Sequence, residues 1–298
     1  MEQKTKVLSE KDIDKVATRQ RVTKIAVQSA LYLFLGILAI IIIFPFYWMI
    51  ISSLKTLLEY EARTPTFFPK KIVWYNYVDA FKVGELGRYF INTLYVGIVS
   101  TVLSLIITVL TAFAFARLEF KGKNALFAAL LATMMIPGEL FTITNYQTVS
   151  ALNWTEGGYT VLIVPFLVSI FYIYLLRQSF MQIPNELYLA AKVDGTKDIK
   201  YLWKVMIPLA LPNIISITIL KMMGSWNSYM WPQLVALPEY QLITNGIRNA
   251  SFSPDPTAPP NMPLQMAAVT LVSIPLFLVF IFLRKYIMKG VSRSGIKG

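Results

Sequence analysis

The sequence predicts an all-α, polytopic membrane protein with six membrane-spanning helices. Of its 298 residues, 56% are hydrophobic and 15% are charged, whereas an ordinary soluble domain has about 25% charged residues. Four long stretches contain no Asp, Glu, Lys or Arg, and a bilayer core needs about 20 apolar residues per helix. These stretches are Ile25–Leu54, Tyr89–Ala116, Gly157–Leu176 and Pro256–Leu283.

The charge-free stretches and the apolar segments between them place the spans along the chain. We expect spans at about residues 25–54, 89–116, 124–145, 159–177, 207–231 and 264–284. Pro137-Gly138 lies inside the third span and favours a broken helix there; the alternative is that a short helix ends at this point. The predicted organisation is a cytoplasmic tail (1–24), the first span (25–54), an extracytoplasmic loop (55–88), a core with five spans (89–285) that includes a cytoplasmic loop (178–206), and a second cytoplasmic tail (286–298).

Basic residues set the expected orientation. The net charge is +12, and 20 of the 28 Lys and Arg residues fall in segments that lie inside if the N-terminus is cytoplasmic, against seven in the outer loops. This asymmetry follows the positive-inside rule, so both termini are expected in the cytoplasm. It also accounts for the net charge without nucleic-acid binding.

The residue types that are absent exclude several chemistries. The chain has no cysteine and no histidine, which removes disulfides, thiolate zinc sites and the usual general base. No Gly-x4-Gly-Lys-Ser/Thr sequence occurs, so the chain has no P-loop for ATP phosphates. We therefore expect no catalytic residue, no metal site and no enzyme activity. The first apolar stretch is too long for a signal peptide and is expected to be retained as a helix.

The cytoplasmic loop is predicted to form two short helices. Pro184 and Asn185 favour the start of the first helix, with the Asn185 side chain accepting bonds from free N–H groups. Gly195 is expected to end this helix in the left-handed conformation, and Thr196 to cap the second helix. Pro208 marks the return of the chain to the membrane.

Each of these helices is expected to present one distinct face. In the first helix Leu187, Ala190, Ala191 and Asp194 share a face, and in the second Ile199, Leu202, Trp203 and Met206 form an apolar stripe. The two alanines allow another backbone to approach closely, so the helix pair is suited to dock in a cleft of another protein. The alternative is an amphipathic hairpin on lipid headgroups, which the four lysines of this loop would suit.

Short motifs in a fixed order resemble one family of proteins. They are Phe44-Pro45-x-x-Trp48, Ser53-Leu54-Lys55, Asn76-Tyr77, Asn92-Thr93-Leu94, Ala112-Phe113-Ala114-Phe115-Ala116-Arg117, Pro137-Gly138-Glu139, Leu175-Leu176-Arg177-Gln178, Leu189-Ala190-Ala191 followed by Gly195, Val205-x-Ile207-Pro208, Gly224-Ser225-Trp226-Asn227 and Gly295-Ile296-Lys297-Gly298. Over roughly residues 30–298 the chain is similar to carbohydrate-uptake permeases of bacterial ABC importers in the maltose-transporter class. Within that class it looks like the smaller, MalG-like subunit, which has the MetI-like fold.

The resemblance implies one half of a heterodimeric channel in the bacterial cell membrane. The implied partners are a MalF-like second permease, two ABC ATPases that bind ATP and Mg²⁺, and an extracytoplasmic binding protein that delivers a sugar or oligosaccharide. The cytoplasmic loop would be the coupling loop that receives the ATPase, through Glu186, Leu187, Leu189, Ala190, Ala191, Asp194, Gly195 and Pro208. The tail Ser292–Gly298 would also reach the ATPases; a frayed terminus is the alternative.

One position departs from the family pattern. Leu189 stands where family members usually carry Glu directly before the two alanines. The ion pair between that acid and an ATPase arginine is therefore in doubt. Either Glu186 or Asp194 could replace it, or the contact is apolar.

Lys221 is unusual because it lies within a predicted span. An intramembrane charge is expensive and tends to face a cavity. Thr218, Ser225 and Ser228 share its helical face and would give a polar stripe along a sugar path. The alternative is a structural ion pair with the partner permease. Related subunits usually have an uncharged residue here, so an acidic or phosphorylated sugar is a possible cargo.

Aromatic and amide residues near the end of the same span are further candidates for the path. Trp226 and Tyr229 could stack on sugar rings, and Asn227 could bond to hydroxyl groups. The alternative, which we favour, places Trp226 and Trp231 in the outer aromatic belt and makes Asn227 a helix cap.

Two other classes of protein compete with the permease hypothesis. A secondary, ion-coupled solute transporter would typically offer intramembrane Asp or Glu, and Glu139 is the candidate near a span. A membrane anchor for a soluble partner is disfavoured by the kinked spans and the polar stripe.

Overall fold

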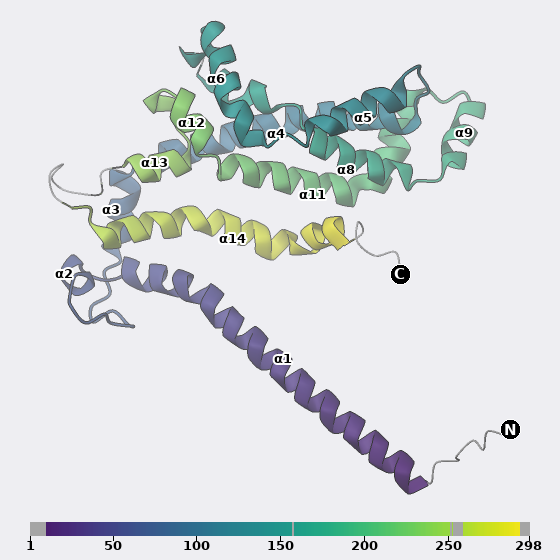
Figure 1. Ribbon diagram of the computed structural model, residues 1–298. Coiled ribbons are helices and arrows are strands. Elements are labelled where there is room, and N and C mark those ends of the chain that lie inside the picture. Colours follow the sequence, from purple (N-terminus) through teal and green to yellow (C-terminus); the bar gives the residue numbers. More distant parts are fainter. Residues whose placement is uncertain (1–9, 157, 251, 253–258, 293–298) are drawn as a thin grey trace.

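The computed structural model describes residues 10–156, 158–250, 252 and 259–292 of the chain. In this part of the chain every regular element is a helix, which confirms the predicted all-α class (Figure 1). The motif Gly295–Gly298 and its predicted contact with an ATPase lie outside the described residues.

Four described helices are long and apolar enough to cross a membrane, and six spans result if each of two bent helix pairs counts as one. The long helices are α1 (Glu10–Ser53), α4 (Leu86–Arg117), α11 (Ile207–Trp226) and α14 (Met262–Ser292). The bent pairs are α5 (Lys123–Thr133) with η1 (Gly138–Leu140) and α6 (Phe141–Ala151), and α7 (Tyr159–Ile163) and η3 (Val164–Phe166) with α8 (Ile170–Met181). The six predicted spans therefore correspond to these six units.

Short helices connect the spans. They are α2 (Leu57–Tyr60), α3 (Tyr75–Val83), η2 (Trp154–Glu156), α9 (Asn185–Val193), α10 (Asp198–Tyr201), the π-helical turn η4 (Leu202–Met206), α12 (Met230–Val235), η5 (Pro238–Tyr240) and α13 (Ile243–Asn249). Helices α9 and α10 lie at one end of the bundle, called here the α9 end, and α12 and α13 lie toward the opposite end (Figure 1).

The predicted break at Pro137-Gly138 is confirmed, because α5 and the η1–α6 unit are bent by 80° across it. A second break, between Phe166 and Ile170, was not expected from the sequence; it bends the predicted 159–177 span by 47°. Pro165 lies in the 3₁₀ turn before this break, and Ser169 starts α8 by accepting a bond from the Tyr172 amide at 3.4 Å.

Helix α1 covers Glu10–Ser53, so the described part of the predicted tail 1–24 is helical and continuous with the first span. One predicted boundary is wrong. The predicted 207–231 span ends at Trp226, because Asn227 is its C-cap and Trp231 belongs to the separate helix α12.

Helix α4 lies at the centre of the bundle and packs against both α8 and α11. One face of α4 carries small residues at intervals of four, and all of them are buried: Ser100, Ser104, Thr108 and Ala112. Small side chains at this spacing let neighbouring helices approach closely in a membrane. This small-residue stripe therefore determines how tightly the core of the bundle can pack.

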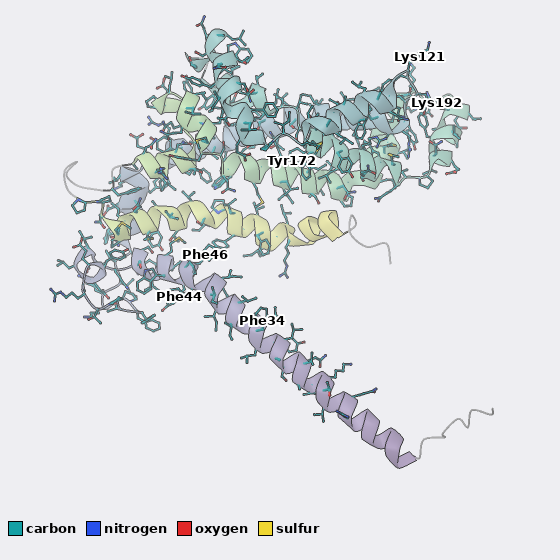
Figure 2. The ribbon with its side chains drawn as sticks, viewed as in Figure 1. Phe34, Phe44, Phe46, Lys121, Tyr172 and Lys192 are labelled. Atoms are coloured by element: carbon teal, nitrogen blue, oxygen red, sulfur yellow. The ribbon has the colours of Figure 1, made fainter. Side chains whose placement is uncertain are left out.

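Helix α1 stands apart from the bundle over most of its length (Figure 1). It packs against α14 near its C-terminal end, where Phe46 lies 5.5 Å from Phe277, ring centre to ring centre. That end is fixed by Asn76, whose side chain donates to the carbonyls of Ser53 at 2.7 Å and Lys55 at 2.9 Å. Farther along, apolar side chains such as Phe34 project without a neighbouring helix (Figure 2).

Candidate functional site

Helices α9 and α10 project from the bundle and form the first candidate site (Figure 1). In α9, the side chains of Leu187, Leu189 and Ala190 are exposed, whereas Ala191 packs against the core cluster below. The predicted face is thus divided: Leu187, Ala190 and Asp194 are exposed at the outer surface, and Ala191 contacts the core.

Gly195 ends α9 as predicted, with a φ of +71° in the left-handed region. Its amide donates to the Lys192 carbonyl at 3.0 Å, and the Thr196 amide donates to the Ala191 carbonyl at 2.8 Å. This pair of bonds is the Schellman motif that satisfies the last carbonyls of a helix. The turn directs the chain from α9 into α10.

The predicted side-chain caps of the two short helices are wrong. Pro184 occupies the N-cap position of α9 and Asn185 is its first helical residue, so Asn185 makes no cap bond. Lys197, not Thr196, precedes α10, and again no side chain caps the helix.

An ion pair fixes α9 against α10. The Lys192 ammonium lies 2.6 Å from the Asp198 carboxylate, and the Tyr188 hydroxyl donates to the same carboxylate at 2.8 Å. The hydrogen bond to Asp198 raises the pKa of Lys192 above its ordinary value. Lys192 therefore has an acidic partner within the loop.

A π-helical turn, Leu202–Met206, joins α10 to α11. Because this turn holds an extra residue, the predicted single stripe of the second helix separates into two faces. Leu202 and Met206 are fully buried in the core, whereas Ile199 is exposed and Trp203 is 63% exposed. Pro208 follows in the first turn of α11.

Two arginines that carried no assigned role in the sequence join the ends of α4 and α8, directly before the link to α9. Arg117, at the end of α4 and only 8% exposed, donates to the carbonyls of Phe180 at 2.9 Å and of Ile183. These carbonyls belong to the end of α8 and the link to α9. In the sequence, the signal for the two arginines was a charge placed directly at the end of an apolar stretch.

Arg177 makes the reciprocal contact from α8 to α4. Its Nε donates to the Phe115 carbonyl at 3.1 Å, and its guanidinium lies 4.1 Å from the centre of the Phe127 ring. The ends of α4 and α8 are thereby cross-linked by two guanidinium groups just before the chain enters α9.

The second candidate site is a cavity of about 340 Å³ beside the break between η3 and α8. Lys221 lines it, and its ammonium donates to the Phe166 carbonyl at 2.7 Å. The other lining residues are Val96, Ser100, Leu162, Val168, Ser169, Tyr172, Gly224, Ser225, Ser228, Trp231, Pro232 and Leu242. This volume lies at the lower end of the range for small-molecule pockets.

The cavity brings together three of the six residues predicted for the substrate path: Lys221, Ser225 and Ser228. Thr218 lies outside it and donates to the Ile214 carbonyl of its own helix at 2.8 Å. The sequence did not single out Tyr172 or Trp231 for this role. Tyr172 belongs to α8, after the break at Phe166, and Trp231 belongs to α12, after the end of α11. The pattern of apolar spans reveals neither of these boundaries.

Trp226 and Asn227 also lie outside the cavity. Trp226 is 5% exposed and packs edge-to-face on Phe90 at 5.4 Å, within the core and not in an outer aromatic belt. Asn227 is the C-cap of α11, and its side chain donates to the Met223 carbonyl at 2.9 Å. Tyr229 faces Arg248, whose guanidinium lies 5.1 Å from its ring centre.

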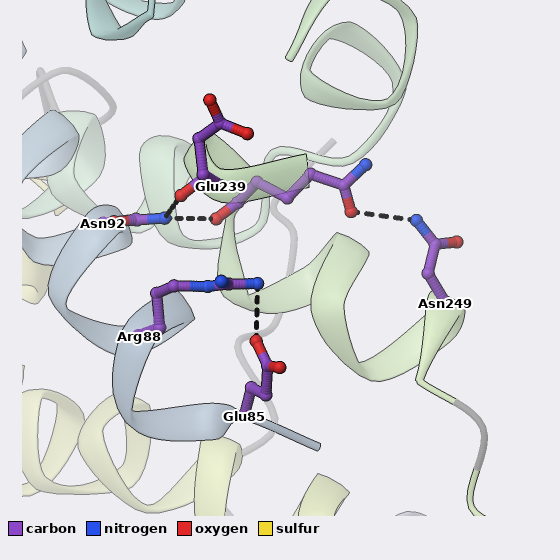
Figure 3. A network of polar contacts seen from close by, with 6 residues as sticks. Glu85, Arg88, Asn92, Glu239 and Asn249 are labelled. Carbon is purple, nitrogen blue, oxygen red and sulfur yellow. Dashed lines mark hydrogen bonds and ion pairs between the residues drawn. The ribbon is translucent and has the colours of Figure 1, made fainter. Parts of the chain in front are cut away.

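A polar network closes the bundle at the end opposite α9 (Figure 3). The Asn92 side chain donates to the carbonyls of Glu239 at 2.8 Å and Gln241 at 3.0 Å. It also accepts a bond from the Tyr159 hydroxyl at 2.6 Å. The network holds α4, α7 and the segment before α13 together, next to the lining residue Leu242.

Glu139, the candidate ion-coupling residue of a secondary transporter, lies exposed at the break between α5 and α6.

The structure superposes with a TM-score of 0.78 on a chain from a bacterial ABC transporter involved in the import of the acidic polysaccharide alginate. The two sequences are 23% identical, over 95% of this chain and 99% of that one.

The chain belongs to the family of binding-protein-dependent transport system inner membrane components, which matches residues 104–293. It is therefore the permease subunit of an ABC importer with the MetI-like fold. Such a subunit forms a membrane channel, is not an enzyme, and works with an ATPase and a substrate-binding protein. This family gives no support to an ion-coupled secondary transporter.

Several relatives match over most of their length. The arabinooligosaccharides transport system permease protein AraQ of Halalkalibacterium halodurans is 30% identical over 88% of this chain and 93% of its own. AraQ of Bacillus subtilis is 29% identical over 90% of this chain and 95% of its own. The sulfoquinovosyl glycerol transport system permease protein SmoH of Agrobacterium fabrum is 29% identical over 86% of this chain and 89% of its own.

We predict that Gly195→Val uncouples ATP hydrolysis from transport, while Gly195→Asn preserves most of the coupling. A side chain at Gly195 meets no atom within 4 Å, so the cost is conformational. It is about 1–3 kcal/mol for a β-branched residue held at positive φ, a region that Asn tolerates. The measurement is the ratio of substrate transported to ATP hydrolysed in proteoliposomes. An unchanged ratio in a fully assembled Val variant would contradict this role of the turn.

We predict that Arg117→Met weakens the stimulation of ATPase activity by the loaded binding protein, with Arg117→Lys intermediate. The Met side chain leaves the carbonyls of Phe180 and Ile183 without their buried donor, at a cost of about 1–3 kcal/mol. The stimulated and the basal ATPase rates are compared in intact complexes. Lys121→Met, on an exposed side chain at the same end (Figure 2), is the control. A purely structural role would lower both rates or assembly together and leave their ratio unchanged.

Proposed function

We propose that this chain forms one half of the membrane channel of a sugar or oligosaccharide importer, next to a MalF-like second permease subunit. Two ABC ATPases would bind ATP and Mg²⁺ and drive the channel, and an extracytoplasmic binding protein would deliver the cargo. The observation that carries the proposal is the projecting α9–α10 pair, which follows directly on the ends of α4 and α8 that Arg117 and Arg177 hold together.

We place the α9 end and both chain termini in the cytoplasm of a bacterial cell. The exposed lysines of the α4–α5 connection and of the coupling loop gather at this end, where Figure 2 labels Lys121 and Lys192. The beginning of α1 and the end of α14 point toward the same side (Figure 1). This distribution agrees with the positive-inside rule.

The exposed half of α9 is the surface that we assign to the ATPase cleft. Leu187, Leu189 and Ala190 give a small apolar contact area. Glu186 and Asp194 flank it with exposed carboxylates, one at each end of the helix. Either acid is available to an ATPase arginine, so the ion pair lost with Leu189 has two possible replacements.

The sugar class rests on the named relatives and on the cavity. AraQ and SmoH are named for arabinooligosaccharides and for sulfoquinovosyl glycerol. The cavity combines aromatic rings with hydroxyl groups, among them Tyr172, Trp231 and Ser228. Binding sites of this kind present apolar surface together with a few fixed polar groups.

We predict that Ala190→Cys cross-links to a cysteine introduced into the ATPase cleft. The chain has no native cysteine, and Ala190 is exposed on the α9 surface, so the product identifies this contact directly. Cross-linking is scored by gel mobility after mild oxidation of the membrane-embedded complex. Absence of the product in an active complex would reject the assigned surface.

The same variant tests the orientation of the chain. A membrane-impermeant thiol reagent added to whole cells should label Ser150→Cys, on the exposed side of α6, and should spare Ala190→Cys. Labelling of Ala190→Cys from outside would reverse the proposed topology.

We predict that the purified complex, reconstituted with its binding protein, imports at least one short oligosaccharide when ATP is enclosed in the liposomes. Neutral and acidic disaccharides to tetrasaccharides are offered in parallel with an amino acid and a dipeptide. Uptake of the amino acid or the dipeptide, with no uptake of any sugar, would overturn the carbohydrate assignment while leaving the permease family intact.

A further inference from the structure

The cavity beside the η3–α8 break has an uncompensated positive charge. Lys221 is its charged lining residue, and no carboxylate is among the described residues that line it. The ammonium donates one bond, to the Phe166 carbonyl at 2.7 Å. An ammonium has three donors, so its remaining hydrogen-bonding capacity can be used by a ligand in the cavity.

The position of Lys221 follows from the break in the neighbouring span. The Phe166 carbonyl lies in the η3 turn, where the chain bends by 47° before α8. Ser169 caps the start of α8 and lines the same cavity. The first turn of a helix carries a partial positive charge, so it adds to the field of the ammonium and does not cancel it.

Hydroxyl groups surround the ammonium. Ser225 lies one helical turn after Lys221 and shares a bond of 3.3 Å with Ser100, and Ser228 follows just beyond the end of α11. Tyr172 contributes a phenol from α8. These groups can donate to or accept from the hydroxyls of a sugar, whereas a simple inorganic anion would use few of them.

Aromatic surface completes the lining. Trp231 packs edge-to-face on Phe166 at 5.4 Å, and its indole N–H donates to the Val161 carbonyl at 2.9 Å. The indole is therefore held in place by α7, through a residue that does not line the cavity. Fixed rings beside hydroxyl groups and one cation match a ligand with apolar C–H faces, hydroxyls and one acid group.

We propose that this cavity binds a carboxylate-bearing sugar unit during import, with its carboxylate on Lys221. The inference rests on the proposed function and narrows the cargo from oligosaccharides in general to acidic ones. An ammonium without an anionic partner is expensive inside a membrane, and an acidic sugar supplies that partner only while it passes. An acid of the second permease could instead pair with Lys221 permanently, and the test separates the two.

The absence of native cysteine permits a direct test of the charge selectivity of the cavity. Ser225→Cys, in the assembled complex, is treated with an anionic sulfonatoethyl and with a cationic trimethylammonium-ethyl methanethiosulfonate, and the rate ratio is measured. We expect the anionic-to-cationic ratio to fall about ten-fold or more when Lys221→Met is added, and to be retained with Lys221→Arg. The ratio cancels any effect of Lys221 on the reactivity of the thiol itself.

Ser150→Cys, on α6 and outside the cavity, is the matched control, and its rate ratio should not depend on Lys221. If Ser225→Cys does not react, or if its ratio is the same with Lys221 and with Lys221→Met, the proposal is wrong. A permanent ion pair with an acid of the partner subunit would instead leave the ratio of Ser225→Cys, with Lys221 present, close to that of the Ser150→Cys control, and Lys221→Met would then reduce assembly; that result also overturns the proposal.

Uptake separates the failure of this inference from the failure of the proposed function. Digalacturonate and its neutral counterpart galactobiose compete with the imported oligosaccharide in proteoliposomes. We expect Lys221→Met to reduce the preference for the acidic competitor by about ten-fold, as for loss of a charge-assisted hydrogen bond, with galactobiose unaffected. Sugar uptake with an unchanged preference rejects the acidic cargo alone, whereas absence of any sugar uptake rejects the proposed function.

Discussion

The close approach of α4 to α8 and α11 depends on the small-residue stripe of α4. Ser100, Ser104, Thr108 and Ala112 fall on one line of the helix and are all buried. In a membrane there is little hydrophobic force between helices, so association relies on close packing and on hydrogen bonds. A larger side chain at any of these positions would separate α4 from its neighbours and displace the arginine contacts and the cavity together.

Both candidate sites are consequences of this packing. At the α9 end, α4 and α8 lie close enough for Arg117 and Arg177 each to reach a main-chain carbonyl of the other helix. Farther along, the break after Phe166 leaves space beside α4 and α11 and frees a carbonyl that Lys221 binds. Irregular backbone at membrane depth is tolerated where it lines a cavity or is buried in protein. The α4–α8 pair thus carries the arginine contacts near its α9 end and borders the cavity farther along its length.

The sequence predicts features with a strong local cause. Four charge-free stretches and the apolar segments between them locate the six spans, Pro137-Gly138 locates one break, and Gly195 ends α9 because of its positive φ. Features that depend on packing were missed. Pro165 did not indicate a break because proline also occurs in intact membrane helices. The apolar stripe of the second short helix was predicted with 3.6 residues per turn, and the π turn at Leu202–Met206 has more residues per turn than that. The cavity that Lys221 shares with Tyr172 and Trp231 is built from three elements, α11, α8 and α12, and so depends on how they pack.

Helix α1 is fixed to the rest of the chain at one end only. Its 44 residues span about 66 Å at 1.5 Å per residue, roughly twice the thickness of a bilayer core. A rotation of about 5° at the anchored end, where Asn76 holds Ser53 and Lys55, moves the far end by on the order of 5 Å. The path of this helix through the membrane is therefore decided largely by lipid thickness and by whichever helices lie beside it, so the same subunit can fit bilayers of different depth without any change in its core.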